Sequence, residues 1–165
     1  MSEIDLSGAC KSEDEALKSF IFWKVFLLII ICSLGNYFTT MNYKNVPSST
    51  IHDTIFLEDV MLAGGVVNGL SRGFWGAMLI NFGFKYVFVV TMGLNIICFI
   101  VIHWVIYNYE MYIFVYSIIC AVLGGLMVLI SNLCLLLFGD FIGNEIFTYF
   151  WATFSLSCFL QYLLR

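Results

Sequence analysis

One arginine of this sequence, Arg72, lies within an apolar stretch, four positions after Asn68 and four positions before Gly76. A guanidinium keeps its charge at every accessible pH, and an arginine at the centre of a bilayer costs about 2.5–3.5 kcal/mol on insertion scales. Such a residue marks a functional site by default, and its planar fork suits a carboxylate. Residues four apart lie one above the other on a helix, so Asn68 either orients the Arg72 fork or binds the ligand beside it.

A second interpretation of Arg72 stays open, in which the side chain extends along its helix toward a membrane surface. Lys85 follows about a dozen residues later and marks the side that Arg72 would reach. The two interpretations place the guanidinium in different surroundings. In the first it faces a watery cavity lined by protein, and in the second it lies among lipid headgroups.

The composition indicates that a lipid bilayer surrounds most of the chain. Of its 165 residues, 62% are hydrophobic and 11% are charged, whereas soluble domains carry about 25% charged residues. The net charge of −4 gives no sign of a nucleic-acid surface. The cysteines lack the paired spacing of zinc sites, and no nucleotide-binding, zinc-protease or nucleophile-elbow motif is present. We therefore expect a multi-pass integral membrane protein that is not an enzyme and needs no metal or cofactor.

Five segments are long and apolar enough to span a bilayer, which takes about 20 residues. They cover about residues 20–40, 59–80, 86–107, 111–138 and 142–164, and they follow an acidic N-terminal segment over residues 1–19. The predicted fold is therefore all-α, a polytopic bundle of about five transmembrane helices over residues 20–164. Lysines near the helix ends favour a cytoplasmic N-terminus. Glu58 and Asp59 are expected in the first turn of the second segment, where carboxylates favour the positive end of the helix dipole.

Small residues form a stripe along the second segment. Gly65, Gly69 and Gly73 recur at every fourth position, and this spacing lets two helices approach closely within lipid. The stripe therefore predicts a packing surface that is offset from Asn68 and Arg72.

Further polar residues lie within the predicted spans. His103 is either a proton-coupling group or an interfacial side chain. Four others are expected to form hydrogen bonds between helices, namely Asn36, Asn95, Ser131 and Asn132.

The stretch from Asn68 to Lys85 resembles the eighth helix and the following loop of major facilitator superfamily transporters. The resemblance is greatest to the oxalate/formate antiporter and monocarboxylate transporter group, whose arginine precedes the first glycine of the loop signature by four positions. Gly76, Gly83 and Lys85 match that signature. The resemblance implies that Arg72 binds a substrate carboxylate and that Asn68 assists it. It also implies that the five spans correspond to helices seven to eleven of a twelve-helix fold.

The sequence departs from the family pattern in two places. Ile80 occupies the position of the signature's aspartate, which in the family latches neighbouring helices on the cytoplasmic side, and this puts the gate in doubt. The last segment holds no lysine, although dicarboxylate-handling members place one there. The resemblance therefore implies secondary transport of a small monocarboxylate or related organic anion.

Alternating access in this superfamily takes two six-helix halves around a central site, whereas this sequence predicts about five spans. Three explanations stay open. The chain is a fragment of a full transporter, it assembles with a second chain that supplies the other half, or it is a non-transporting structural membrane subunit. The expected partners are accordingly a small organic anion, the lipid bilayer and a second half, with no nucleic acid.

Overall fold

The computed structural model describes residues 13–45, 47 and 53–164, and these residues form helices and no strand. A short α1 (Glu13–Lys18) precedes four long helices, α2 (Phe20–Met41), α3 (Thr54–Phe82), α4 (Phe84–Val105) and α5 (Tyr109–Leu164). Each of the four is long and apolar enough to cross a membrane. The predicted all-α fold of apolar helices is thus confirmed. Residues 1–12 of the expected acidic segment lie outside the described residues, and the number of crossings stays a prediction.

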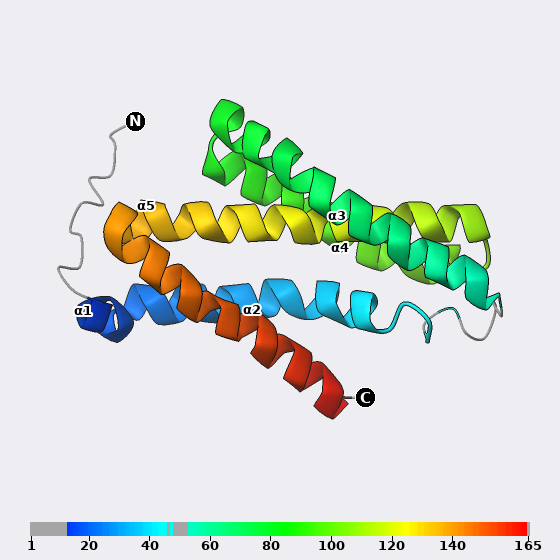
Figure 1. The fold of residues 1–165 in the computed structure, drawn as a ribbon, viewed down its shortest axis with the longest axis horizontal. Helices are drawn as coiled ribbons and strands as arrows, with labels where there is room; N and C mark the ends of the chain where they lie inside the picture. The colour runs from blue at the N-terminus through cyan, green and yellow to red at the C-terminus, as the bar shows by residue number, and fades with distance from the viewer. Residues whose placement is uncertain (1–12, 46, 48–52, 165) are drawn as a thin grey trace.

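The last helix, α5, consists of two arms that meet at Gly139. Gly139 has φ 79° and ψ 171°, a backbone conformation that glycine adopts without strain. The two arms, residues 109–138 and 140–164, run in different directions from this point (Figure 1). They also pack closely, because a Cβ atom on Gly143 would lie 2.8 Å from the carbonyl oxygen of Cys134. The arms coincide with the fourth and fifth predicted spans.

Replacing Gly139 by alanine is expected to destabilise the protein by about 1–2 kcal/mol, because an L residue is strained at this positive φ. The melting temperature of the purified protein in detergent measures the effect. Gly93→Ala is the matched control, since a Cβ atom there meets nothing within 4 Å and alanine favours a helix interior by about 0.5–1 kcal/mol. Equal melting temperatures for the two variants would show that the bend does not depend on glycine.

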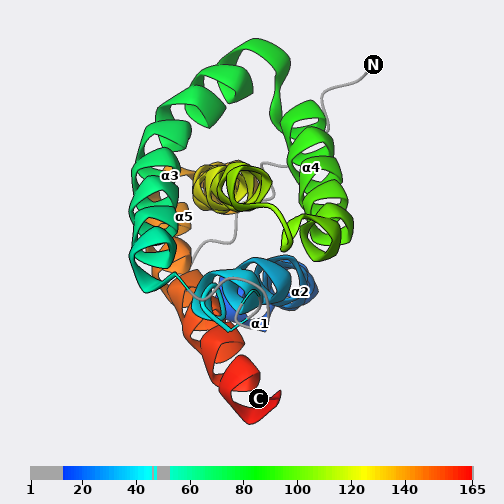
Figure 2. The ribbon, with the colours of Figure 1, turned by 90° about the vertical axis from the view of Figure 1, so that its right-hand side faces the viewer.

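The first arm of α5 is the centre of the bundle. Figure 2 shows it between α3 and α4, with α2 beneath it. This central position explains why α5 is the most buried of the long helices. In its most apolar stretch 61% of the residues are buried, against 22–28% in the corresponding stretches of the other three long helices. Three clusters of side chains hold the helices on this arm. They gather around Tyr116 with α3 and α4, around Cys134 with α2 and the second arm, and around Leu129 with Trp75.

Apolar side chains cover the outside of the bundle, and many polar ones lie inside it. Large exposed hydrophobic residues occur on every long helix, among them Leu27, Ile31, Leu70, Val89, Ile100, Trp104 and Phe159. Buried polar residues include Ser33 and Ser157, whose hydroxyl oxygens lie 2.9 Å apart and join α2 to the second arm of α5. Exposed hydrophobic side chains are stable in contact with lipid, whereas polar side chains in a bilayer must form their hydrogen bonds within the protein. This distribution is that of a membrane protein.

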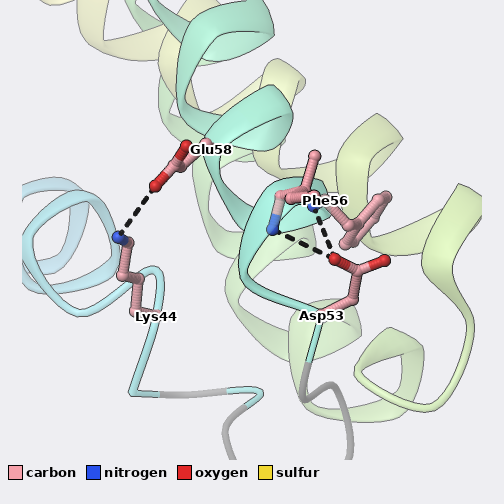
Figure 3. A network of polar contacts seen from close by, with 5 residues as sticks. Lys44, Asp53, Phe56 and Glu58 are labelled. Carbon is pink, nitrogen blue, oxygen red and sulfur yellow. Dashed lines mark hydrogen bonds and ion pairs between the residues drawn. The ribbon is translucent and has the colours of Figure 1, made fainter.

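The helix α3 begins at Thr54 rather than near Asp59, because Asp53 caps it. One carboxylate oxygen of Asp53 accepts hydrogen bonds from the N–H groups of Ile55 and Phe56, at 3.0 and 3.2 Å (Figure 3). The expectation that Glu58 and Asp59 occupy the first turn is therefore wrong. Glu58 instead faces the turn that follows α2, where its carboxylate lies 4.0 Å from the ammonium group of Lys44 (Figure 3).

Candidate functional site

A polar seam joins α3 to α5, made of three α3 side chains that donate hydrogen bonds to α5 carbonyl groups. The amide of Asn68 donates to the carbonyl oxygen of Cys120 at 2.9 Å. The hydroxyl of Ser71 and the indole N–H of Trp75 both donate to Ala121, at 3.1 and 2.9 Å. Positions three and seven residues after Asn68 lie on one helix face. The seam therefore fixes the rotation of α3 about its own axis.

Two glycines of α5 allow this close approach. A Cβ atom on Gly124 would lie 2.4 Å from the Ser71 hydroxyl oxygen and 2.6 Å from the Asn68 carbonyl oxygen. A Cβ atom on Gly125 would lie 2.8 Å from the Trp75 ring. Carbonyl groups of α5 are within reach of α3 side chains because neither glycine holds the helices apart.

The predicted glycine stripe of α3 makes no such contact within the described residues. A Cβ atom on Gly65, Gly69 or Gly73 would meet nothing within 4 Å. The close approach of α3 occurs at Gly64 instead, where a Cβ atom would lie 2.5 Å from the Tyr116 ring. The rotation set by the seam thus leaves the stripe unpacked, and packing through it stays a prediction for a helix outside this bundle.

Arg72 is exposed and lies beside the seam. Its guanidinium donates to the side-chain oxygen of Asn68 at 3.3 Å, so the pair expected from the four-residue spacing is formed. Asn68 is itself held by Cys120, and both ends of its amide are engaged. Among the described residues Arg72 has no other hydrogen-bond acceptor and no ion-pair partner. A guanidinium has five N–H groups, so most of the fork is available to a ligand.

Two adjoining cavities flank Arg72, which lines both together with Met127. The α2–α3 cavity holds about 290 Å³ between α2, α3 and the first arm of α5, and its lining includes Tyr37, Met61, Tyr116 and Leu123. The α3–α5 cavity holds about 480 Å³ between α3 and both arms of α5, and its lining includes Ser131, Asn132, Phe147 and Trp151. Among the described residues, Arg72 is the only charged one that lines either cavity.

The three residues that match the loop signature are only partly brought to the site. Gly76 lines the α3–α5 cavity with Arg72. Gly83, with φ 77°, forms the turn between α3 and α4, and Lys85 is exposed just after it. Neither Gly83 nor Lys85 lines the two cavities.

Several polar residues take positions that the sequence did not indicate. Ser131 and Asn132, expected to bond across helices, line the α3–α5 cavity without a hydrogen bond in the part of the chain described here. His103 is exposed near the end of α4 and lines neither cavity. The roles of Ser71 and Trp75 were not predicted from the sequence, although their spacing from Asn68 places them on its helix face.

The arrangement can bind one anion. It offers a fixed cation, oriented by a neutral amide, at the junction of two mainly apolar cavities. The described residues contain no cluster of His, Cys, Asp and Glu that could hold a metal ion. No protein-family model, no curated protein and no solved structure matches the chain.

Proposed function

We propose that this chain binds the carboxylate of a small monocarboxylate or related organic anion at Arg72 and carries it across a membrane. The observation that supports this most directly is that the Arg72 guanidinium is available to a ligand. Among the described residues, Asn68 is its one hydrogen-bond partner, and the guanidinium is the one charged group that lines the two cavities. A carboxylate that enters can take two parallel hydrogen bonds from the fork.

The charge balance of the site favours a monoanion. One carboxylate neutralises Arg72, and a second carboxylate would find no further cation among the described residues that line either cavity. An unpaired charge out of water is costly, so a dicarboxylate would bind only with its second group outside the cavities.

The transport step extends this binding site with the resemblance of Asn68–Lys85 to the major facilitator superfamily. In that mechanism two helical bundles rock around a site near the middle of the membrane. The five straight segments of this bundle correspond in the proposal to helices seven to eleven. A second bundle, from the same or another polypeptide, then covers the cavities that flank Arg72. The unpacked glycines Gly65, Gly69 and Gly73 make α3 easier to bend during this motion.

Uptake into liposomes tests the proposal. The chain, with any partner that co-purifies in mild detergent, is reconstituted and supplied with radiolabelled acetate, lactate or pyruvate. We expect saturable uptake, which Arg72→Ala lowers at least a hundredfold, because two hydrogen bonds to a charged group contribute about 3 kcal/mol or more. Lys24→Ala is the matched control, since Lys24 is an exposed cation of α2 that lines neither cavity. Uptake that is the same in Arg72→Ala as in the unaltered protein would refute the proposal.

The second candidate function is that of a structural membrane subunit that transports nothing. The unpacked face of α3 favours it, because Gly65, Gly69 and Gly73 leave room for a helix of another chain. Under this function a large complex co-purifies with the chain, and Arg72→Ala leaves the activity of that complex intact. The same variant therefore separates the two functions.

A further inference from the structure

We infer that the anion held by Arg72 carries an aromatic body, so that the ligand is an aryl monocarboxylate rather than a small hydrophilic acid. This inference rests on the proposed function, because it concerns the same site. The evidence for the aromatic body lies in the side chains that surround the guanidinium and in the hydrogen bonds that nearby polar groups already make within the protein.

The α2–α3 cavity provides aromatic and thioether surface beside Arg72. Tyr37 from α2 and Tyr116 from α5 line it, and Met61, Leu123 and Met127 complete its apolar wall. Aromatic and methionine side chains pack well against a ring, through offset or edge contacts and through sulfur. A ligand without an apolar body would leave these surfaces without a partner.

Two polar groups of this cavity are engaged within the protein. The hydroxyl of Thr40 donates to the carbonyl oxygen of Asn36 at 2.8 Å. The amide of Asn68 is occupied at both ends, by Cys120 and by Arg72. A second carboxylate on the ligand body would meet no further cation among the described lining residues, and its desolvation would oppose binding.

The α3–α5 cavity on the other side of Arg72 is also mainly apolar, and its lining includes the aromatic side chains of Phe147 and Trp151. It differs in holding Ser131 and Asn132, which make no hydrogen bond in the described part of the chain and can bind a polar group of the ligand or a water molecule. An amphipathic ligand matches this arrangement, with its carboxylate on the fork and its ring toward Tyr37 and Tyr116.

The size of the α2–α3 cavity sets the scale of the ring. The cavity holds about 290 Å³, whereas a closed apolar cavity of roughly 150 Å³ accommodates benzene. One ring with a carboxylate or a short side chain therefore fits within this cavity.

Equilibrium binding tests the inference with probes that carry the same charge and different bodies. The full chain, with any partner that co-purifies in mild detergent, is placed in lipid nanodiscs and titrated at neutral pH with radiolabelled benzoate and, separately, with radiolabelled acetate. We expect a Kd for benzoate at least tenfold below that for acetate, as burial of a ring implies. Phthalate, which adds a second carboxylate to the same ring, is expected to compete at least tenfold more weakly than unlabelled benzoate.

Two matched substitutions on α3 assign the ring to its cavity. Gly65 lines the α2–α3 cavity and Gly69 does not, while a Cβ atom on either would meet nothing within 4 Å. Gly65→Leu is therefore expected to occupy part of the cavity without disturbing the packing. It should raise the Kd for benzoate at least fivefold and leave the Kd for acetate within twofold. Gly69→Leu should leave both unchanged.

Arg72→Ala distinguishes failure of this inference from failure of the proposed function. Loss of all binding in Arg72→Ala, with benzoate favoured in the unaltered protein, supports both. If Arg72→Ala abolishes binding but benzoate and acetate bind equally well, the aromatic preference is overturned and anion binding stands. Benzoate binding that survives Arg72→Ala, or no binding of either probe to the unaltered protein, overturns both.

Discussion

Replacing Gly124 by alanine is expected to lower the stability of the bundle by about 2–4 kcal/mol. The new Cβ atom would lie 2.4 Å from the hydroxyl oxygen of Ser71 and 2.6 Å from the carbonyl oxygen of Asn68. The second of these is a backbone atom, so no change of rotamer can relieve the contact. The helix α3 must move away from α5, and the hydrogen bonds that Asn68, Ser71 and Trp75 donate to α5 lengthen together.

Thermal unfolding in detergent measures this loss, and we expect the melting temperature to fall by about 5–10 °C. Gly69→Ala is the control, because its Cβ atom meets nothing within 4 Å and alanine slightly favours a helix. The double variant Gly124→Ala with Ser71→Ala removes the hydroxyl contact and keeps the backbone contact. It should therefore recover little stability. A melting temperature for Gly124→Ala that equals that of Gly69→Ala would contradict the close packing of α3 on α5.

A second large effect is expected where Asn68 positions Arg72 for the anion. Asn68→Ala removes the side-chain oxygen that accepts a hydrogen bond from the Arg72 guanidinium. It also removes the hydrogen bond that the Asn68 amide donates to the carbonyl oxygen of Cys120. The guanidinium keeps its charge but loses its orientation, so we expect the KM of anion uptake to rise about tenfold. Asn68→Asp should be worse than Asn68→Ala, because a carboxylate at this place forms an ion pair with Arg72 and competes with the anion.

The double variant Asn68→Ala with Arg72→Ala shows whether the two residues act as a unit. If Asn68 acts through Arg72, the double variant takes up no less anion than Arg72→Ala alone, and the two effects are not additive. Arg72→Lys keeps the positive charge without the planar fork, and an intermediate loss is expected. Should Asn68 only join the helices, Asn68→Ala would lower the melting temperature and leave KM unchanged.

The Gly124 variants test how α3 packs on α5, and the Asn68 and Arg72 variants test how the anion binds beside that interface. Trp75 of α3 and Gly124 of α5 lie in the interface between these two helices, and their loss is expected to affect stability. Arg72 lies next to that interface, and the stem of its side chain lies near Gly124, but its guanidinium makes no hydrogen bond to α5 among the described residues. Its loss should therefore affect stability less than the loss of Gly124 and should remove binding. If the first variants lower only the stability and the Arg72 variants lower only anion binding, the α3–α5 interface is a rigid support that holds Arg72 in position for the anion.

The sequence by itself determined the class of the protein and the local geometry of its site. Low charge and long apolar segments predicted an all-α bundle of apolar helices, because only helices satisfy their own backbone hydrogen bonds in lipid. The break at Gly139 coincides with a predicted connection. The four-residue spacing of Asn68 and Arg72 also predicted their contact, which depends only on the helical period.

The rotation and the neighbours of each helix were decided by the tertiary structure alone. Helical periodicity states which residues share a face, but it does not state which face meets which helix. The stripe of Gly65, Gly69 and Gly73 satisfies the rule for close packing, yet α3 packs through the face of Gly64 and Ser71 instead. Tyr37 and Tyr116 are far from Arg72 in the sequence, and only the packing of α2 and α3 on the central arm of α5 brings their side chains to its cavity. That packing follows from the seam, because buried donors within lipid must find acceptors and thereby fix where α3 lies.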